Sequence, residues 1–265
     1  MNRTIIIGDV HGCYYTLQAL LEKLRFSPGT DCLYFLGDVI GKGKHSDKVL
    51  DFLMDTPVCK TVLGNHDVSW LRSYALQQFD REDFQQLSQS SSADRWFQYL
   101  IKMPFLIRIN AVYLVHASLY PSWYGDDALE ISHWLSRQLQ SDPKLFFESM
   151  QRPPVLKWSK DLSDSEKRYL ALQILTRCRY YKPSEEMDID SVGEPEAQRG
   201  LTPWYEKPRN IKEPIYFGHW ASLKGRVLGK DCTLDGGAVY GGHLLAIDLD
   251  SKESWQQKRV SKDEP

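Results

Sequence analysis

The stretch LYFLGDVIGKGKHS, residues 33–46, places an aspartate and then a glycine-bracketed lysine directly after an apolar run. A lysine in a glycine-rich loop after a strand is typical of a phosphate-cradling nucleotide site, whereas a carboxylate at the end of a strand is typical of a metal ligand. The spacing disfavours the nucleotide site, because Gly37 and Gly41 are one residue too close and Gly43 stands where serine or threonine is required. Asp38 is therefore the first candidate functional residue.

Four other segments repeat the pattern of a short apolar run that ends in Asp, Asn or His. They read IIIGDVHG, KTVLGNHD, VYLVHAS and PIYFGHW, at residues 5–12, 60–67, 112–118 and 214–220. In open α/β sheets, functional groups collect where the strands end at their carboxyl edge, so we expect these five ends to converge. The side chains brought together in this way are Asp9, His11, Asp38, Asn65, His66, His116 and His219.

This set of side chains offers oxygen and imidazole nitrogen but no thiolate. Such donors suit Mn²⁺, Fe²⁺, Co²⁺ or Zn²⁺ and differ from a structural cysteine–zinc site. Each segment alone has an ordinary explanation: Asp9 is also a plausible helix cap, and His219 beside Trp220 is also typical of a core histidine. The joint pattern favours metal, and its size favours two ions that share a carboxylate, activate a bridging water and hold the oxygens of a phosphoryl group.

The overall composition is that of an ordinary soluble globular protein, with 265 residues, 42% hydrophobic residues and a net charge of −2. That charge disfavours nucleic-acid and membrane partners, so an anionic substrate must be captured by local positive charge. The five cysteines are odd in number and form no CxxC pair, which predicts reduced thiols and a cytoplasmic location. No apolar run reaches the length of a membrane span, and no protein partner is indicated.

Strands and helices alternate in the first third of the chain, which predicts parallel βαβ units. Strand-like runs at 5–7, 33–36 and 60–63 alternate with helix-like segments at 14–24, 49–54 and 68–76. Later strands are expected at 105–109, 112–115, 215–217, 244–247 and around 255–260, with a mainly helical region at 126–181. We expect one α/β domain over residues 1–260, an excursion at about 120–212, and a disordered tail at 261–265.

The order GDVHG, GDVIGKG, GNHD, a strand ending in His116, and FGHW resembles the calcineurin-like metallophosphoesterases. It is similar to their phosphoprotein-phosphatase branch, whose motifs read GDxHG, GDxVDRG, GNHE and HGG. Within that branch, the segments LTRCRYY, FGHWASLKG and TLDGGAVYGGHL resemble the bacterial symmetrical diadenosine tetraphosphatases. The resemblance runs from Thr4 to about Leu249 and implies two packed mixed β-sheets flanked by helices, with the helical excursion near the active site.

The resemblance also implies a mechanism, in which diadenosine tetraphosphate is cleaved symmetrically into two ADP molecules. It implies two divalent ions, with Mn²⁺ favoured and Co²⁺ or Fe²⁺ as alternatives. A hydroxide between the ions attacks phosphorus, and His66 remains free to protonate the leaving oxygen as general acid. The implied metal ligands are Asp9 and His11 for the first ion, Asp38 as the bridge, and Asn65, His116 and His219 for the second.

Three positions depart from the family pattern: Gly41 and Lys42 replace the acid and the arginine of GDxVDRG, and HAS replaces HAG at Ser118. In the protein phosphatases that acid orients the general-acid histidine, so its loss argues for a better leaving group such as a nucleoside diphosphate. Lysine keeps the charge of arginine without its bidentate fork, and we expect Lys42 to contact phosphate as a point charge. Ser118 is expected near the second ion.

Further positive charge comes from Arg177 and Arg179 in LTRCRYY. On a helix, residues two apart do not share a face, so we expect only one of them, Arg177 by the resemblance, to reach phosphate. Asp235 and His243 are candidate partners that orient the metal-binding histidines. Aromatic side chains that offer stacking faces for a base are Trp220, Tyr240, Trp123 and Trp204.

Three other functions remain open at this point. A phosphoprotein or phosphomonoester phosphatase uses the same chemistry on a poorer leaving group. Removal of nucleoside-tetraphosphate caps from RNA is chemically equivalent, although the acidic chain shows no RNA-binding track. A metal-binding regulatory protein without catalysis is supported only by the departures from the family motifs, and the retained His66 argues against it.

Overall fold

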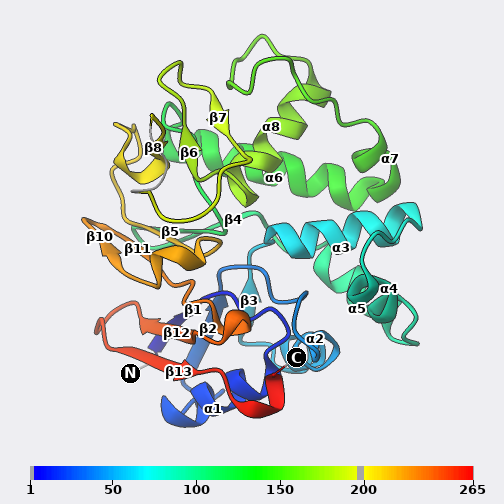
Figure 1. The fold of residues 1–265 in the computed structure, drawn as a ribbon, viewed down its shortest axis with the longest axis vertical. Helices are drawn as coiled ribbons and strands as arrows, with labels where there is room; N and C mark the ends of the chain where they lie inside the picture. Colours follow the sequence, from blue (N-terminus) through cyan, green and yellow to red (C-terminus); the bar gives the residue numbers. More distant parts are fainter. Residues whose placement is uncertain (1–2, 196–199, 265) are drawn as a thin grey trace.

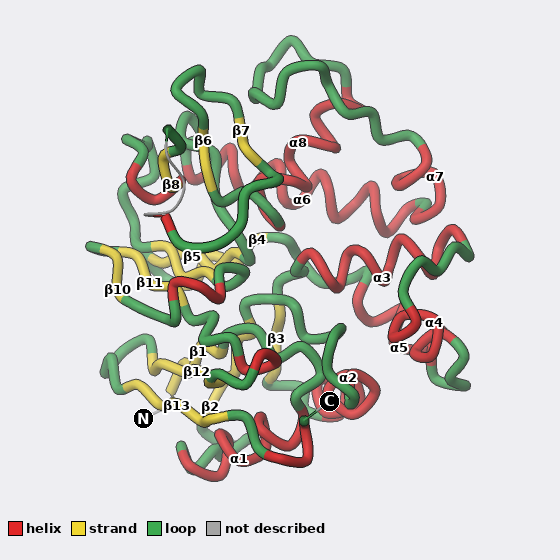
Figure 2. The backbone as a smooth tube through the Cα atoms, in the orientation of Figure 1, coloured by secondary structure: helices red, strands yellow, loops and turns green. Residues whose placement is uncertain are grey.

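The predicted alternation of strands and helices is present in the computed structural model, which describes residues 3–195 and 200–264. Two mixed five-stranded sheets form the centre of the fold, with helices around them (Figures 1 and 2). This architecture confirms the predicted α/β class with two packed mixed sheets. No helix in the described ranges is long and apolar enough to cross a membrane.

The first sheet has the strand order β13-β12-β1-β2-β3. β1, β2 and β3 run parallel, and β12 is antiparallel to β1, with Ile6 opposite Ile247. The parallel strands therefore all point their carboxyl ends in one direction, as the sequence predicted. The strands of this sheet are β1 (Arg3–Ile7), β2 (Asp31–Phe35), β3 (Cys59–Thr61), β12 (His243–Asp248) and β13 (Ser254–Lys258).

The second sheet has the order β10-β11-β9-β5-β4. Its three central strands, β5, β9 and β11, are parallel to one another, while β4 and β10 run antiparallel at the two edges. β10 and β11 were not foreseen, because each is only two or three residues long. The strands are β4 (Leu106–Ile109), β5 (Val112–Val115), β9 (Ile215–Phe217), β10 (Val227–Leu228) and β11 (Asp231–Thr233).

The two sheets pack face to face because their central strands are apolar on both sides. In β1, Ile6 joins Leu114 and Tyr216 of the second sheet in one buried cluster, while Ile5 and Ile7 point the other way, into the larger core shared with the helices. Burial on both faces explains the unbroken isoleucine run of β1. Each such side chain stabilises the fold by roughly 1.5–3 kcal/mol relative to exposure.

The α-helices lie outside the sheets, and α6, α7 and α8 gather at the end opposite α1 (Figure 1). α4 and α5 lie between the segments for which the sequence predicts a helix or a strand. The helices are α1 (Tyr14–Lys23), α2 (Ser46–Asp55), α3 (Asn65–Leu76), α4 (Glu82–Ser88), α5 (Ala93–Leu100), α6 (Gly125–Ser141), α7 (Pro143–Glu148) and α8 (Asp164–Thr176).

The second half of the expected excursion is not helical. Between α8 and β9 the chain forms a small antiparallel sheet in the order β7-β6-β8, followed by the 3-10 helix η2 (Trp204–Glu206). The strands are β6 (Tyr180–Tyr181), β7 (Met187–Asp188) and β8 (Thr202–Pro203). Their short length left no periodic signal in a region rich in proline and charge. Residues 196–199 of this excursion lie outside the described residues.

The prediction of a disordered tail at 261–265 is wrong for the described residues 261–264. Ser261–Asp263 form the 3-10 helix η5, and the Asp263 side chain is buried. Its carboxylate accepts hydrogen bonds from the backbone N–H groups of Tyr15 and Thr16, at 3.3 and 2.6 Å, and from the Thr16 hydroxyl at 2.7 Å. A carboxylate from the end of the fold thus caps the N-terminus of α1, where Cys13 provides no side-chain cap. Pro265 lies outside the described residues.

We expect Asp263→Ala to lower the free energy of unfolding by about 1–2 kcal/mol, because two N–H groups at the start of α1 lose their acceptor. Denaturant-induced unfolding measures the change, and the exposed neighbour Glu264→Ala is the control. Equal stability of the two variants would contradict the cap.

Candidate metal centre and phosphate cavity

The ends of the parallel strands converge on one cavity of about 430 Å³, as the sequence predicted. Six of the seven expected side chains line it, and His116 lies fully buried behind them. Asp235, which follows β11, also lines it. A larger cavity of about 740 Å³ lies against β10–β13, but none of these side chains lines it. The six lining residues are Asp9, His11, Asp38, Asn65, His66 and His219.

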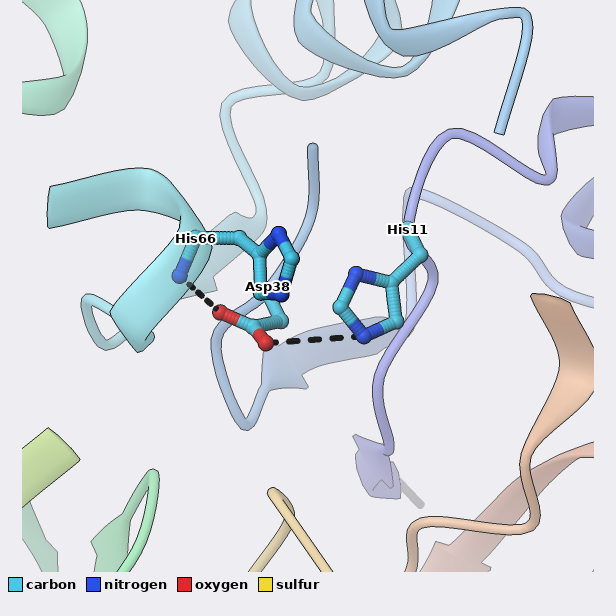
Figure 3. Close-up of side chains that lie close together, drawn as sticks. All are labelled: His11, Asp38 and His66. Carbon is cyan, nitrogen blue, oxygen red and sulfur yellow. Dashed lines mark hydrogen bonds and ion pairs between the residues drawn. The ribbon is translucent and has the colours of Figure 1, made fainter. Parts of the chain in front are cut away.

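Asp38 occupies the centre of the cluster (Figure 3). Its Oδ1 accepts a hydrogen bond of 2.7 Å from the His66 backbone N–H. Its Oδ2 lies 3.5 Å from Nε2 of His11 and 3.5 Å from Nε2 of His116. One oxygen therefore faces imidazoles from both sheets, as expected of a carboxylate shared by two ions.

In the described part of the chain, two groups of three residues each bring their potential ligand atoms within 4.8 Å of one another, and Asp38 belongs to both groups. One group adds His11 and His66, and the other adds Asp9 and His116. The sharing fits the expected bridge. The grouping differs from the sequence-based set, which paired Asp9 with His11 and left His66 as a non-ligand.

In His11 and His116, Nδ1 is hydrogen-bonded to a backbone carbonyl, which leaves Nε2 as the nitrogen that can bind a metal. His116 donates Nδ1–H to the Leu36 carbonyl at 2.7 Å, and His11 does so to the Ile40 carbonyl at 3.3 Å. A carbonyl is only an acceptor, so in each neutral ring Nε2 carries the lone pair. Nε2 of His116 nevertheless lies 3.0 Å from Asn65 Oδ1, another acceptor. Two acceptors at this distance repel each other, and a cation bound by both would remove the repulsion.

The buried carboxylates at the cavity also fit bound cations. Burial raises the pKa of Asp38 to about 7 and that of Asp67 to about 7, and it raises the pKa of Asp9 well above its usual value, with added repulsion from Asp235 and Asp38. Burial likewise raises the pKa of Asp235. Carboxylates that repel one another in a desolvated site need a positive counter-charge to ionise.

The imidazoles are neutral over the same pH range. Burial lowers the pKa of His11 to about 3 and that of His116 to about 4, and it lowers the pKa of His219 well below its usual value, with a further contribution from the Arg179 charge. His66 behaves alike: burial lowers its pKa, with smaller contributions from His11, Lys42 and Arg81. Neutral imidazoles and carboxylates form a donor set that suits divalent ions.

The glycines before the ligands have a steric cause. A Cβ on Gly64 would lie 2.2 Å from Asp38 Oδ1, and a Cβ on Gly218 would lie 2.0 Å from Asp9 Oδ1. The carboxylate of one strand end thus occupies the space of the side chain missing from another. The Gly218 position also lets the His219 backbone N–H donate to both oxygens of Asp9, at 3.2 and 3.1 Å.

Three of the candidate ligands have a left-handed backbone. The φ angles are 47° at His11, 48° at Asp38 and 64° at His219. For side chains other than glycine this conformation costs about 1–3 kcal/mol each, so the surrounding packing must impose it. The side chain at each of these tight turns lines the cavity.

Among the described residues, three cationic side chains open onto the same cavity: Lys42, Arg177 and Arg179. The premise that both arginines lie on a helix is wrong, because α8 ends at Thr176 and Arg177 is its C-terminal cap. Both can therefore reach the cavity. Arg179 is half-buried and donates to the His219 carbonyl at 2.7 Å, whereas Arg177 is exposed and donates to the Ser69 hydroxyl at 3.2 Å.

The aromatic candidates separate into two classes. Tyr240 is 64% exposed at the cavity mouth, where its hydroxyl accepts a hydrogen bond from Lys42 Nζ. Trp220 lines the cavity but is buried, with its indole N–H bonded to the Gly193 carbonyl at 2.8 Å. Trp123 and Trp204 are buried in the core and do not line the cavity, so they cannot stack on a base bound there.

Two other expectations changed. Ser118 does not line the cavity; it is fully buried and donates to the Ile174 carbonyl of α8 at 2.7 Å, which fastens that helix to the end of β5. His243 begins β12 and bridges Gly237 through its backbone, outside the residues that line the cavity. Asp235 remains at the cavity and accepts from the Gly237 N–H at 3.0 Å.

Sequence reasoning missed two residues that support the site. Asp67, in the quoted motif GNHD, is fully buried and accepts from the N–H groups of Gly64 and Ile40, at 2.8 and 3.3 Å. It ties the β2 and β3 loops together, and its place beside His66 was a usable signal. Arg81 donates to His66 Nδ1 at 2.8 Å, and no motif marked it.

The model of the calcineurin-like phosphoesterase family matches residues 3–219. The chain belongs to this family. A symmetrical bis(5'-nucleosyl)-tetraphosphatase from Pseudomonas entomophila is 33% identical over 94% of this chain and 92% of its own, and the protein of that name from Methylococcus capsulatus is 34% identical over 92% and 90%.

A solved structure described as a candidate diadenosine tetraphosphatase superposes with a TM-score of 0.64 at 24% identity. It covers 98% of this chain and 95% of that chain, which supports the fold. Together with the family match, it confirms the calcineurin-like fold.

We expect Gly218→Ala to weaken metal binding roughly 10- to 100-fold, because its methyl group displaces the Asp9 carboxylate. Titration with Mn²⁺ followed by electron paramagnetic resonance measures the loss. Gly29→Ala is the matched control, since an added Cβ there meets no atom within 4 Å. Equal affinity in both variants would refute the steric account.

We expect Mn²⁺ affinity to rise with pH through about 7 and to level off only when Asp9, whose pKa burial also raises, has lost its proton. Since burial raises the pKa of Asp38 to about 7, this carboxyl holds a proton at pH 6 and must lose it to bind the ion. His11 and His116, with pKa values lowered to about 3 and 4, release none there. Calorimetry in buffers of different ionisation enthalpy counts the protons. An affinity that is constant from pH 5.5 to 8 would contradict this.

Proposed function

We propose that this protein is a two-metal hydrolase that cleaves diadenosine tetraphosphate symmetrically into two ADP molecules. The observation that supports it most is the cavity itself, where the carboxylate–imidazole cluster and three cationic side chains lie together. A metal cluster alone would serve many phosphoesters. Three added cations match a chain of several anionic phosphates, in a protein whose net charge of −2 provides no general attraction.

The candidate ligands divide into two sets around Asp38, which would bridge the ions. We assign Asp9 and His11 to the first ion. We assign Asn65, His116 and His219 to the second, since the facing acceptors of Asn65 and His116 call for a cation. Mn²⁺ is favoured, with Co²⁺ and Fe²⁺ as alternatives. Two such ions supply Lewis acidity, an activated water and a clamp for the phosphoryl oxygens.

The chain's own residues bind and orient the polyphosphate. Arg179, held against the His219 carbonyl, and Arg177 are placed to hold non-bridging oxygens, with Lys42 beside them as a point charge. Tyr240 and Trp220 are placed to border the bound nucleoside. His66 remains as the donor to the leaving oxygen, because the other ligands suffice for two ions.

The leaving group is the reason to prefer an anhydride over a phosphoprotein. Gly41 offers no carboxylate to His66, so the donor lacks the partner that helps to protonate an alkoxide. A nucleoside diphosphate leaves readily without that help. Hydrolysis of phosphomonoesters and of nucleoside-tetraphosphate caps on RNA are the competing outcomes of the test below.

We expect the Mn²⁺-loaded protein to convert diadenosine tetraphosphate to ADP alone, as separated by anion-exchange chromatography. EDTA should abolish turnover and added Mn²⁺ should restore it. ATP and AMP as the products would refute symmetric cleavage, and turnover that survives chelation would refute the metal mechanism. Equal turnover of a phosphoserine peptide, or of capped RNA, would move the proposal to those substrates.

A further inference from the structure

The His66 ring has a partner at its Nδ1. Arg81, at the start of α4, places Nη1 at 2.8 Å from this nitrogen. Gly41 lies against the same ring: an added Cβ there would lie 2.7 Å from Nδ1, so position 41 has no room for a side chain beside this imidazole. The position at which the wider family carries an acid is thus vacant, and a cation approaches the same ring nitrogen from another element.

The polarity of this contact is fixed by its chemistry. A guanidinium has five N–H donors, no acceptor, and does not deprotonate in proteins. The hydrogen bond must therefore run from Arg81 to Nδ1, which acts as the acceptor. An imidazole that accepts at Nδ1 carries its proton at Nε2, the nitrogen left to face the ligand cluster. A carboxylate at position 41 would impose the opposite arrangement, with a proton held on Nδ1.

We propose that Arg81 is a positioning residue that locks His66 as the Nε2–H tautomer and thereby suits the site to phosphoanhydrides instead of alcohol esters. This inference deepens the proposed function and rests on it for the identity of the substrate. The tautomer itself is a property of the chain alone.

Arg81 is held firmly enough to perform this task. Its guanidinium is paired with Asp83 through Nε and Nη2, and it lies 4.0 Å above the Phe84 ring centre. Asp83 also accepts from the Lys42 backbone N–H at 3.0 Å. The Asp83 carboxylate therefore holds both the backbone of Lys42 and the guanidinium of Arg81. Through this carboxylate, the proposed phosphate contact Lys42 is linked to His66, the donor to the leaving oxygen.

The chemical consequence concerns the departing oxygen. Water adds to an inner phosphorus, the P–O bond to the departing nucleoside diphosphate breaks, its electron pair stays on that oxygen, and the protons of water pass to solvent. Nε2–H of His66 donates a hydrogen bond to the departing oxygen without transferring its proton, since transfer from a neutral imidazole would leave an imidazolate. A phosphate oxygen tolerates this, whereas an alkoxide requires the proton.

The first test reads the tautomer directly. Long-range ¹H–¹⁵N spectra of the full chain, metal-free and loaded with diamagnetic Mg²⁺, should show His66 with Nε2 protonated and Nδ1 bare. In Arg81→Met, which keeps the length of the side chain over Phe84 but has no donor, we expect a mixture of tautomers. Arg81→Lys retains a cationic donor and should restore the single form. Arg72→Met, an exposed site on the same helix as His66, is the matched control.

The second test is kinetic. With diadenosine tetraphosphate, Arg81→Met should lower kcat roughly 10- to 100-fold, the typical effect of losing a histidine's orienting partner. KM should change less than about twofold, since substrate contacts remain. Arg81→Lys should recover most of the rate, and His66→Asn should lower kcat at least as far as Arg81→Met does. Wild-type rates on aryl phosphates should fall steeply as the leaving group becomes more basic.

An unchanged His66 tautomer in Arg81→Met, or a kcat equal to that of Arg72→Met, would overturn the inference. If diadenosine tetraphosphate proves not to be a substrate, the proposed function fails alone, because the nitrogen spectra and the aryl phosphate series still decide the role of Arg81.

Discussion

The Asp38 carboxylate is the contact on which the other features of the site depend. One of its oxygens is held by the start of α3, and the other faces imidazoles that arrive from two different sheets. It therefore links the start of α3 to strand ends from both sheets. The Asp38 carboxylate occupies the space that a side chain at position 64 would need, which explains Gly64. The φ of 48° at Asp38 is an unfavourable backbone conformation that the surrounding packing imposes.

Burial of several carboxylates at one point is unfavourable unless a cation is bound, and backbone N–H groups hold these carboxylates in place. Asp9, Asp67 and Asp235 each accept from backbone N–H groups. These bonds keep the oxygens in place before an ion arrives, so little reorganisation is needed on binding. The carboxylates are thus preorganised to bind a cation.

The candidate ligands were predictable because a general rule of parallel sheets places them: each follows an apolar run, and such ends meet at one edge. The supporting contacts were not. Arg81 and Asp263 act through side chains that meet distant elements, and neither lies in a periodic segment or a motif. Arg177 and Arg179 were misjudged because a helix was extended past its end at Thr176. The short strands β6 to β8 and β10 are fixed by tertiary pairing, which local sequence does not encode.

The pairing of β1 with β12 has a consequence for how the protein forms. Ile5 lies opposite Asp248, so the strand that leads to Asp9 and His11 gains one of its two neighbours only from the far end of the chain. β5 and β9 are likewise paired, although helices α6 to α8 and the small β6–β8 sheet separate them in the chain. Such distant contacts make folding slow, because the entropy of closing a long loop is lost before the contacts between its ends can stabilise the fold. During synthesis on the ribosome, metal binding should therefore be among the last properties to emerge, and chains released early would be exposed to aggregation instead of partly active.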